Sequence, residues 1–131
     1  MFLALKFAEA ATAPDNLVLK TDATGEALYA RAAYRPGDVV FCFEGGELRS
    51  QRDQHTVELP DGRHLFHPVL ALTAHACEPN CCVDLHGRRM VAIRSISSGE
   101  AITFDYETTE RWFSHPFWCR CGARRCRGRI G

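Results

Sequence analysis

Short runs of apolar residues, separated by turn residues, dominate the hydrophobic pattern of the chain. Runs of four to six residues bounded by Gly, Pro and Asp predict β-strands. The Asp-Gly pair at 61–62 and the tripeptide His-Gly-Arg at 86–88 each predict a tight hairpin. We therefore expect strands at residues 16–20, 27–32, 39–44, 56–59, 83–86, 89–94 and 101–106.

Only residues 68–75 favour a helix, and Pro79 follows soon after. No periodic segment reaches the length of an ordinary amphipathic helix, and the chain has no internal repeat or low-complexity linker. At 131 residues the chain suits a single domain. The sequence therefore predicts a mainly β domain built from several small sheets.

The overall composition is that of an ordinary globular protein, with 46% hydrophobic and 24% charged residues. Acidic and basic side chains balance at 16 each, so net charge favours neither nucleic acid nor a membrane as a partner. Their distribution is uneven, because residues 111–131 contain six arginines and no acidic residue. This basic tail predicts DNA binding only weakly.

Residues 1–13 are partly apolar, but Lys6 and Glu9 interrupt them and no basic stretch precedes them. We therefore expect no secretion signal and no transmembrane segment. The seven cysteines are an odd number, and Cys81 and Cys82 are adjacent. This pattern favours a reducing cytoplasm and metal-bound thiolates over a set of disulfides.

Three cysteines near the C-terminus, Cys119, Cys121 and Cys126, are spaced to hold a metal ion. Zinc prefers four tetrahedral thiolate or imidazole ligands, so one ligand must come from elsewhere in the chain. The alternative is that these are three small core residues. The arginine-rich segment offers them little apolar company, which favours the zinc interpretation.

Four cysteines are candidates for the fourth ligand. Cys42 lies inside a predicted strand and is expected in the core, while Cys81 and Cys82 begin a strand and point to opposite faces. Cys77 lies in a loop stiffened by Pro79 and is the best candidate.

Five short segments, in the family's order along the chain, resemble motifs of the SET-domain family of protein lysine methyltransferases. Residues 75–80 (His-Ala-Cys-Glu-Pro-Asn) resemble its Asn-His-Ser-Cys-x-Pro-Asn pattern, with Ala74 in place of the asparagine. Residues 99–106 (GEAITFDY) resemble Gly-Glu-Glu-Leu-Thr-Phe-Asp-Tyr. Residues 119–126 resemble the Cys-x-Cys-Gly-x4-Cys of the post-SET segment, whose x4 spacing is a little variable and is three residues here. Upstream, residues 25–30 and 37–40 are similar to the family's early glycine motifs, with Ala27 replacing the second glycine.

The resemblance implies a fold with a C-terminal pseudoknot, a SET domain over residues 1–114 (core from about 15) and a zinc-binding post-SET segment over 115–131. It implies methyl transfer from S-adenosylmethionine to the side-chain amine of a lysine in a protein or peptide. Tyr106 matches the catalytic tyrosine. Phe104 lies where the family carries phenylalanine or tyrosine, and phenylalanine there implies di- or trimethylation. Each aromatic is otherwise a half-buried strand residue.

The resemblance also implies a cofactor site. Thr24, Gly25, Glu26 and Ala27 would wrap the methionine part of the cofactor, and His75 would lie near the adenine while its side chain bonds internally. The backbone of Arg120 would touch the adenine, and Trp118 or Phe117 would cover the ring or plug the edge of the domain. His55 matches a tyrosine of the family, and Ala74 an asparagine that bonds the cofactor. Cys77 would be the fourth ligand of one structural zinc.

Ala74 and His55 keep a second interpretation open, a zinc-stabilised SET-fold module that binds a peptide or nucleic acid without catalysis. Residues 44–63 would form the specificity loop. Its acidic residues Glu44, Glu47, Asp53 and Glu58 either attract a basic lysine-containing tail or simply face solvent. By analogy with minimal SET proteins of viruses and bacteria, the chain is also a candidate homodimer.

Overall fold

The computed structural model describes residues 13–22, 25–111 and 113–131. The N-terminal stretch up to residue 12 and the predicted cofactor residue Thr24 lie outside the described residues. Nowhere in these three ranges does a helix have the length and apolar character needed to cross a membrane.

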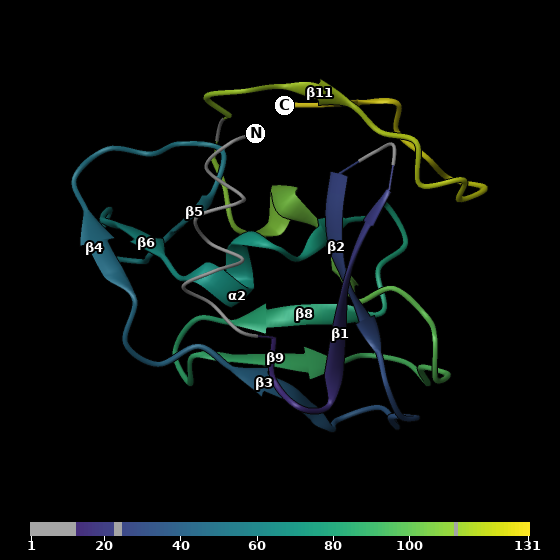
Figure 1. Ribbon diagram of the computed structural model, residues 1–131. Helices are drawn as coiled ribbons and strands as arrows, with labels where there is room; N and C mark the ends of the chain where they lie inside the picture. The colour runs from purple at the N-terminus through teal and green to yellow at the C-terminus, as the bar shows by residue number, and fades with distance from the viewer. Residues whose placement is uncertain (1–12, 23–24, 112) are drawn as a thin grey trace.

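The described chain contains five small sheets of two or three strands (Figure 1). One helix and one 3-10 turn accompany them, α2 (Pro68–Ala71) and η1 (Tyr106–Thr108). The strands are β1 (Leu17–Asp22), β2 (Gly25–Ala30), β3 (Val39–Cys42), β4 (Glu47–Arg49), β5 (Thr56–Glu58), β6 (His64–Phe66), β7 (Ala74–His75), β8 (Cys81–Asp84), β9 (Arg89–Ala92), β10 (Thr103–Phe104), β11 (Phe117–Trp118) and β12 (Arg129–Ile130). The predicted mainly β class is confirmed.

The strands pair in antiparallel fashion except at one place. β1 pairs with β2, β11 with β12, and the two three-stranded sheets have the orders β3-β9-β8 and β4-β6-β5. β10 instead runs parallel to β7, with Thr103 opposite Ala74 and Phe104 opposite His75. This parallel pair brings residues about 30 positions apart in the chain side by side at the centre of the candidate site.

Both predicted hairpins are present. Residues 59–63 connect β5 to β6, and the Gly62 N–H donates to the Leu59 carbonyl at 2.9 Å. Gly62 has a φ of +87°, which favours glycine at this turn. Residues 85–88 connect β8 to β9. Here the Asp84 side chain accepts from the Gly87 N–H at 2.9 Å, which closes the turn.

The predicted helix over 68–75 is wrong in its second half, because α2 ends at Ala71 and residues 74–75 form β7 instead. The His67 imidazole caps the N-terminus of α2 by accepting from the Val69 N–H at 3.2 Å. Residues 47–49 and 64–66 form strands that the hydrophobic pattern did not predict. Strands this short take their stability from neighbouring strands, so the local pattern carries little information about them.

The prediction that Cys42 lies in the core is wrong, since its side chain is exposed. The register of β3 against β9 shifts between Val39 and Phe41, and this bulge directs both Val40 and Phe41 inward. Cys42 therefore faces solvent. Cys81 and Cys82 lie on opposite faces as predicted, the first buried and the second exposed.

The main core is one cluster of buried side chains, whose members come from positions between Leu17 and Phe104 and include the fully buried Phe43 and Met90. Asn80 is buried to 1% exposure within it. Its amide donates to the Ala101 carbonyl at 2.7 Å, and its side-chain oxygen accepts from the Thr103 N–H at 2.9 Å. A buried amide with both ends paired fixes its neighbours strongly. Asn80 thereby holds β10, which carries Phe104, against the start of β8.

Candidate active site and metal centre

Tyr106 follows β10 directly and begins the 3-10 turn η1. Its hydroxyl donates to the Thr73 carbonyl at 2.6 Å, and its backbone N–H donates to His75 Nδ1 at 3.0 Å. Burial raises the pKa of the Tyr106 hydroxyl above its usual 10.0, so the side chain stays a neutral phenol at physiological pH. With its proton committed to Thr73, the oxygen presents its lone pairs as acceptors.

Three rings pack against the ring of Tyr106. The Tyr106 ring centroid lies 4.9 Å from that of Phe104, 5.1 Å from His75 and 5.9 Å from Phe117. Phe117 also meets His75 edge to face, with centroids 5.6 Å apart. Offset and edge-to-face pairs of this kind stabilise a fixed ring arrangement. The tyrosine is therefore held in one orientation from both sides.

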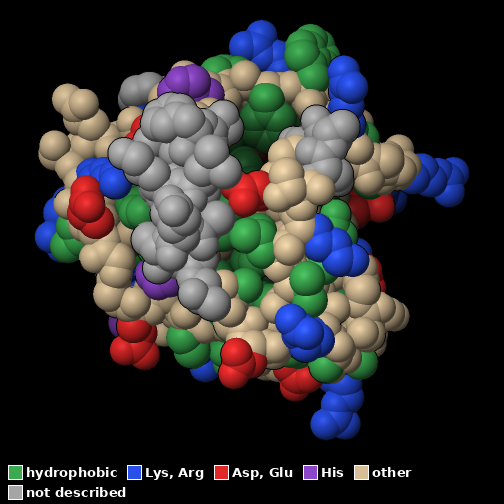
Figure 2. Space-filling model, viewed as in Figure 1, with side chains coloured by type: hydrophobic (Ala, Val, Ile, Leu, Met, Phe, Trp, Pro, Cys, Tyr) green, Lys and Arg blue, Asp and Glu red, His purple; other side chains and the backbone are tan. Residues whose placement is uncertain are grey.

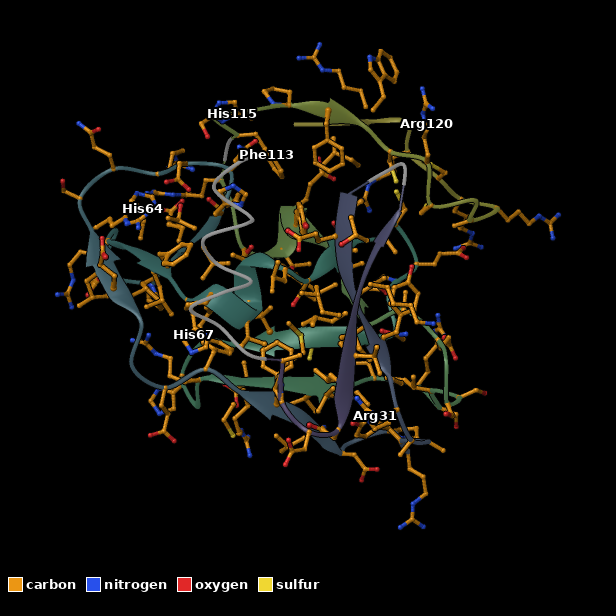
Figure 3. All side chains as sticks on the ribbon, viewed as in Figure 1. Arg31, His64, His67, Phe113, His115 and Arg120 are labelled. Carbon is orange, nitrogen blue, oxygen red and sulfur yellow. The ribbon has the colours of Figure 1, made fainter. Side chains whose placement is uncertain are left out.

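A cavity of about 440 Å³ opens beside these rings. Phe104, Tyr106 and Phe117 supply its aromatic wall, and α2 contributes Leu70 and Ala71. Figure 3 shows Phe113 and His115, two further lining residues, together at one end of the molecule. Such a mostly apolar hollow with a few placed polar groups is typical of a ligand site.

His55 lies on the wall of the same cavity as Tyr106 and Phe104. Burial lowers the pKa of His55, so this imidazole is neutral near pH 7. Of the predicted cofactor residues that the structure describes, His55 and Phe117 line the cavity. The structure thus joins His55 to the two predicted catalytic residues rather than to the glycine motif of β2.

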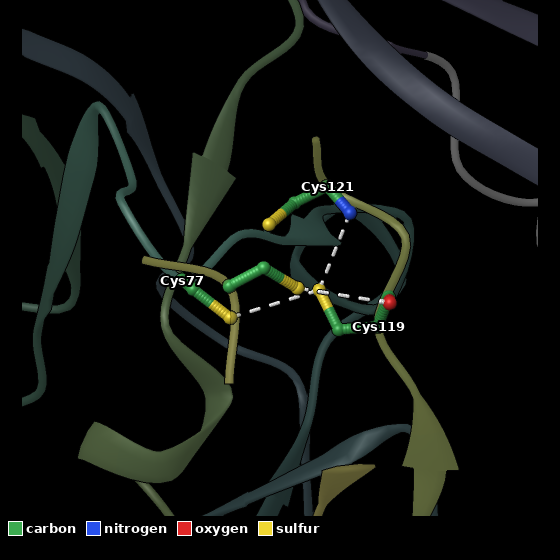
Figure 4. A group of neighbouring side chains, drawn as sticks. Cys77, Cys119 and Cys121 are labelled. Atoms are coloured by element: carbon green, nitrogen blue, oxygen red, sulfur yellow. Dashed lines mark hydrogen bonds between the residues drawn. The ribbon is translucent and has the colours of Figure 1, made fainter. Parts of the chain in front are cut away.

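The sulfur atoms of Cys77, Cys119, Cys121 and Cys126 all lie within 4.8 Å of one another (Figure 4). Cys77 Sγ and Cys119 Sγ are 3.7 Å apart. Four sulfurs at ~2.3 Å from a tetrahedral zinc are separated by ~3.8 Å, so this donor set fits the ion. Burial raises the pKa of Cys77 and of Cys119, and a bound cation would overcome that cost by stabilising the thiolates.

His75 links the cysteine cluster to the tyrosine. Its Nδ1 accepts from the Tyr106 N–H, which leaves the proton on Nε2, 3.5 Å from Cys77 Sγ. Burial lowers the pKa of His75 and keeps it neutral. The prediction that its side chain bonds internally is confirmed, and one imidazole connects a cysteine of the cluster with the backbone of the candidate catalytic residue.

Arg127 makes a second connection. Its guanidinium pairs with Asp105 at 2.7 Å and with Glu107 at 3.0 Å, the residues on either side of Tyr106. Its backbone N–H donates to Cys77 Sγ at 3.3 Å, a contact that stabilises a thiolate. The C-terminal segment is therefore tied to the tyrosine from two directions.

The other predicted cofactor residues lie apart from the cavity. Gly25, Glu26 and Ala27 begin β2, and in the view of Figures 1 and 3 this end of β2 points toward the C-terminal segment, on which Figure 3 labels Arg120. Glu26 Oε1 is buried without a hydrogen-bond partner among the described residues. A buried carboxylate oxygen in this state fits a ligand that brings a hydroxyl or ammonium donor. S-adenosylmethionine carries both kinds of group.

Ala74 lies in β7 opposite Thr103, and its methyl group supplies no hydrogen bond. Phe117 lies in the cavity wall, whereas the Trp118 side chain is 72% exposed. Trp118 therefore does not plug the edge of the domain.

Sequence reasoning missed three contributors to the site. Thr73 acts through its backbone carbonyl, which no side-chain pattern reveals. Phe113 and Glu110 line the cavity from the segment after η1. Glu110 reaches the backbone N–H of Glu58, 52 positions away, so no local spacing could have indicated its role.

The model of the SET domain family matches residues 25–107. The H3 lysine-36 specific histone-lysine N-methyltransferase of Aspergillus oryzae is 29% identical over 140 residues, covering 87% of this chain and 14% of that protein. Histone-lysine N-methyltransferase 2B of Homo sapiens is 39% identical over 59 residues, covering 40% of this chain and 2% of that protein. The chain thus spans a small part of the length of these relatives.

Among solved structures, KRYPTONITE in complex with mCHG DNA and SAH has a similar fold, with a TM-score of 0.71 and 23% sequence identity. The match covers 87% of this chain and 28% of that one. The similarity extends over several small sheets and includes most of the described residues.

Proposed function

The chain belongs to the SET-domain family, and from this premise we propose that it is an S-adenosylmethionine-dependent protein lysine N-methyltransferase. The observation that carries the proposal is the Tyr106 hydroxyl, fixed by the Thr73 carbonyl at 2.6 Å on the wall of an aromatic cavity. The similarity to histone-lysine N-methyltransferases supports a lysine of a basic protein tail as the methyl acceptor.

S-adenosylmethionine, when bound, supplies a methyl group on a positively charged sulfur. Tyr106 accepts a hydrogen bond from the lysine amine and aligns it, since its own proton is committed to Thr73. The neutral phenol does not compete as a nucleophile, because its pKa lies above 10.0. The surrounding rings exclude water from the amine, which favours its uncharged form.

We assign the cofactor to the end of β2, where Glu26 offers its buried carboxylate oxygen, and to the facing C-terminal segment. Residues 115–131 would form the zinc-binding segment, with Cys77 and the three C-terminal cysteines as ligands of one structural zinc. The aromatic wall of the cavity, with Phe104 and His55, would receive the substrate lysine.

Phe104 sets the product state in this proposal. Its ring packs against that of Tyr106, with centroids 4.9 Å apart, and carries no hydroxyl that would compete with a methyl group already on the amine. We expect di- and trimethyl-lysine from the unaltered chain. Phe104→Tyr adds a hydroxyl and should lower the ratio of higher products to monomethyl-lysine by about 10-fold. Mass spectrometry of the modified peptide measures this ratio.

An internal control separates product control from general damage. Phe104→Tyr should act slowly on a peptide that already carries monomethyl-lysine and keep its rate on the unmethylated peptide. Equal losses on both peptides, or only monomethyl-lysine from the unaltered chain, would contradict the role of Phe104.

The activity itself is tested by incubating the zinc-loaded chain with S-adenosylmethionine labelled in its methyl group and a lysine-rich basic peptide. Label on the lysine side chain, located by mass spectrometry, is the expected result. The absence of label together with no heat in a calorimetric titration with millimolar S-adenosylmethionine would refute the proposal.

One observation favours a second candidate function, binding of single-stranded nucleic acid. The exposed Trp118 lies opposite Arg129 on the β11–β12 pair. Arg120, Arg124 and Arg125 are also exposed on this C-terminal segment, and basic side chains project from the upper and right-hand edges of the face in Figure 2. An exposed ring among cations suits base stacking along a phosphate backbone. Retention on single-stranded DNA that Trp118→Ala reduces and salt abolishes would support it.

A further inference from the structure

The charged side chains around the candidate substrate cavity are unevenly distributed. Asp53 and Glu110 line the cavity, and among the described lining residues there is no lysine or arginine. Each carboxylate has an arginine behind the wall, Arg49 at 3.1 Å from Asp53 and Arg52 at 3.5 Å from Glu110. The described wall itself presents two carboxylates and neither lysine nor arginine, which favours a cationic ligand. The cavity therefore suits the side chain of a lysine, and its two carboxylates suit a second cation as well.

A second hollow, of about 720 Å³, adjoins the first and shares Thr109 and Glu110 with it. Its described lining includes four acidic residues and one basic residue, Glu58, Asp61, Glu107, Glu110 and Arg111. Glu110 thus stands on the wall between two neighbouring hollows, both of which carry an excess of negative charge. A peptide could place two adjacent side chains on either side of it.

Glu110 is held in place by partners on β5 and in the loop before it. One carboxylate oxygen accepts from the Glu58 N–H at 2.7 Å, and the other lies 3.5 Å from the Arg52 guanidinium. Its side chain is 9% exposed. The carboxylate is therefore preorganised, since no rotamer search precedes its contact with a ligand.

The two carboxylates of this cluster are compensated unequally. Glu58 accepts from Arg111 at 2.6 Å and from Arg52 at 3.3 Å. The hydrogen bond from Arg111 is the main reason why the pKa of Glu58 is lowered. Among the described residues, Glu110 forms one ion pair, the 3.5 Å contact with Arg52, and burial raises its pKa to about 7. The cluster thus holds one fully paired carboxylate and one that would gain from a further cation.

We propose that Glu110 is a specificity-determining residue that receives a second cationic side chain, lysine or arginine, adjacent in the peptide to the lysine that enters the cavity beside Tyr106. The proposal rests on the proposed methyltransferase function and names its substrate class: a lysine with a basic neighbour. Glu110 acts in recognition, and Tyr106 in the alignment of the amine.

Binding of such a peptide is coupled to proton release. At pH 6.5 part of the Glu110 population is protonated, and a cation beside the carboxylate favours the ionised form, so a proton leaves on binding. At pH 8.5 the Glu110 carboxylate is already ionised, so Glu110 releases no proton when the peptide binds. The charged and titratable groups that surround Glu110 and enter this balance are Arg52, Asp53, His55, Glu58, Asp61, Glu107, Arg111 and His115.

The test compares two peptides that differ only at the neighbour of the lysine, arginine in one and its uncharged isostere citrulline in the other. Calorimetric titration of the zinc-loaded chain, in buffers of different ionisation enthalpy, gives both the dissociation constant and the number of protons released. We expect the arginine peptide to bind about 10-fold tighter at pH 8.5. At pH 6.5 the arginine peptide should release more protons than the citrulline peptide, because deprotonation of the lysine amine is common to both and only the arginine ionises Glu110.

Glu110→Gln should remove both the preference for the arginine peptide and its extra proton release over the citrulline peptide. Glu110→Asp, with its shorter side chain, should keep part of this preference. Glu47→Gln is the matched control, because Glu47 is exposed on β4 and lines neither hollow. If Glu110→Gln does not fold, the peptide pair and the two pH values still decide the question in the unaltered chain.

The outcomes separate this inference from the proposed function. Equal affinity for the two peptides, or a preference that survives Glu110→Gln, overturns the role of Glu110 even where both peptides are methylated. A preference that depends on Glu110 in a chain that transfers no label supports the recognition site and refutes the enzymatic function.

Discussion

Tyr106→Phe is expected to lower the rate of methyl transfer by about 100-fold or more, while the affinity for S-adenosylmethionine changes little. The substitution removes the one hydroxyl that both donates to Thr73 and presents lone pairs to the amine. The ring remains packed between Phe104 and Phe117, so the cavity keeps its shape. The rate therefore falls because the lysine amine is no longer aligned, while the cavity itself remains.

Single-turnover methyl transfer to a lysine peptide measures the rate, and calorimetry measures the affinity for S-adenosylmethionine. Tyr34→Phe is the matched control, because it also removes a hydroxyl with hydrogen bonds, here to Asn16, at a place that does not line the cavity. This control should lower thermal stability and leave transfer intact. A Tyr106→Phe chain that transfers at the full rate would refute the catalytic role of the tyrosine.

Cys126→Ser, or removal of zinc with a chelator, is expected to abolish stoichiometric zinc binding and to weaken the affinity for S-adenosylmethionine at least about 10-fold. The main core should stay folded, since its members lie between Leu17 and Phe104, outside the C-terminal segment. The candidate active site, in contrast, should lose its arrangement around Tyr106. Cys77 contacts His75, and Arg127 holds Asp105 and Glu107 on either side of Tyr106.

Three measurements follow this sequence of events: zinc content by elemental analysis, S-adenosylmethionine affinity by calorimetry, and hydrogen exchange of residues 117–131 compared with residues 81–92. Cys42→Ser and Cys82→Ser are the controls, because both side chains are exposed and neither belongs to the cluster. We expect faster exchange in the first segment only. Full zinc stoichiometry with unchanged affinity in Cys126→Ser would contradict the coupling between the metal centre and the active site.

Much of the candidate site could be predicted from the sequence because its motifs are short and local. The spacing of Cys119, Cys121 and Cys126 suits a small tetrahedral ion, and the structure brings their sulfurs together with that of Cys77. The stiff loop around Pro79 favoured Cys77 as the fourth member, and the structure brings its sulfur to 3.7 Å from Cys119. Turn chemistry likewise predicted both hairpins, since glycine conformation and Asp side-chain bonding act within a few residues.

Other features depend on partners far away in the chain. Residues 74–75 continue a helix in the local pattern, yet they pair with β10 because backbone hydrogen bonds there outweigh a weak local preference. The exposure of Cys42 follows from a register shift against β9, and strand periodicity alone cannot locate such a shift.

The sequence by itself determined the mainly β class, both hairpins and the three C-terminal members of the cysteine cluster, because each depends on residue types at short spacing. It favoured Cys77 as the fourth member, and the family resemblance proposed Tyr106 and Phe104 as the catalytic residues. Only the tertiary structure decided where Tyr106 directs its proton, which imidazole connects it to Cys77, and that Glu110 faces the cavity. The acidic residues of the 44–63 loop show the difference most clearly. Sequence placed Glu58 on a solvated or substrate-attracting rim, whereas folding buries it with Arg52 and Arg111 and leaves Glu110 as the less compensated carboxylate. The physical reason is that the compensation of a buried charge depends on groups brought together from distant parts of the chain.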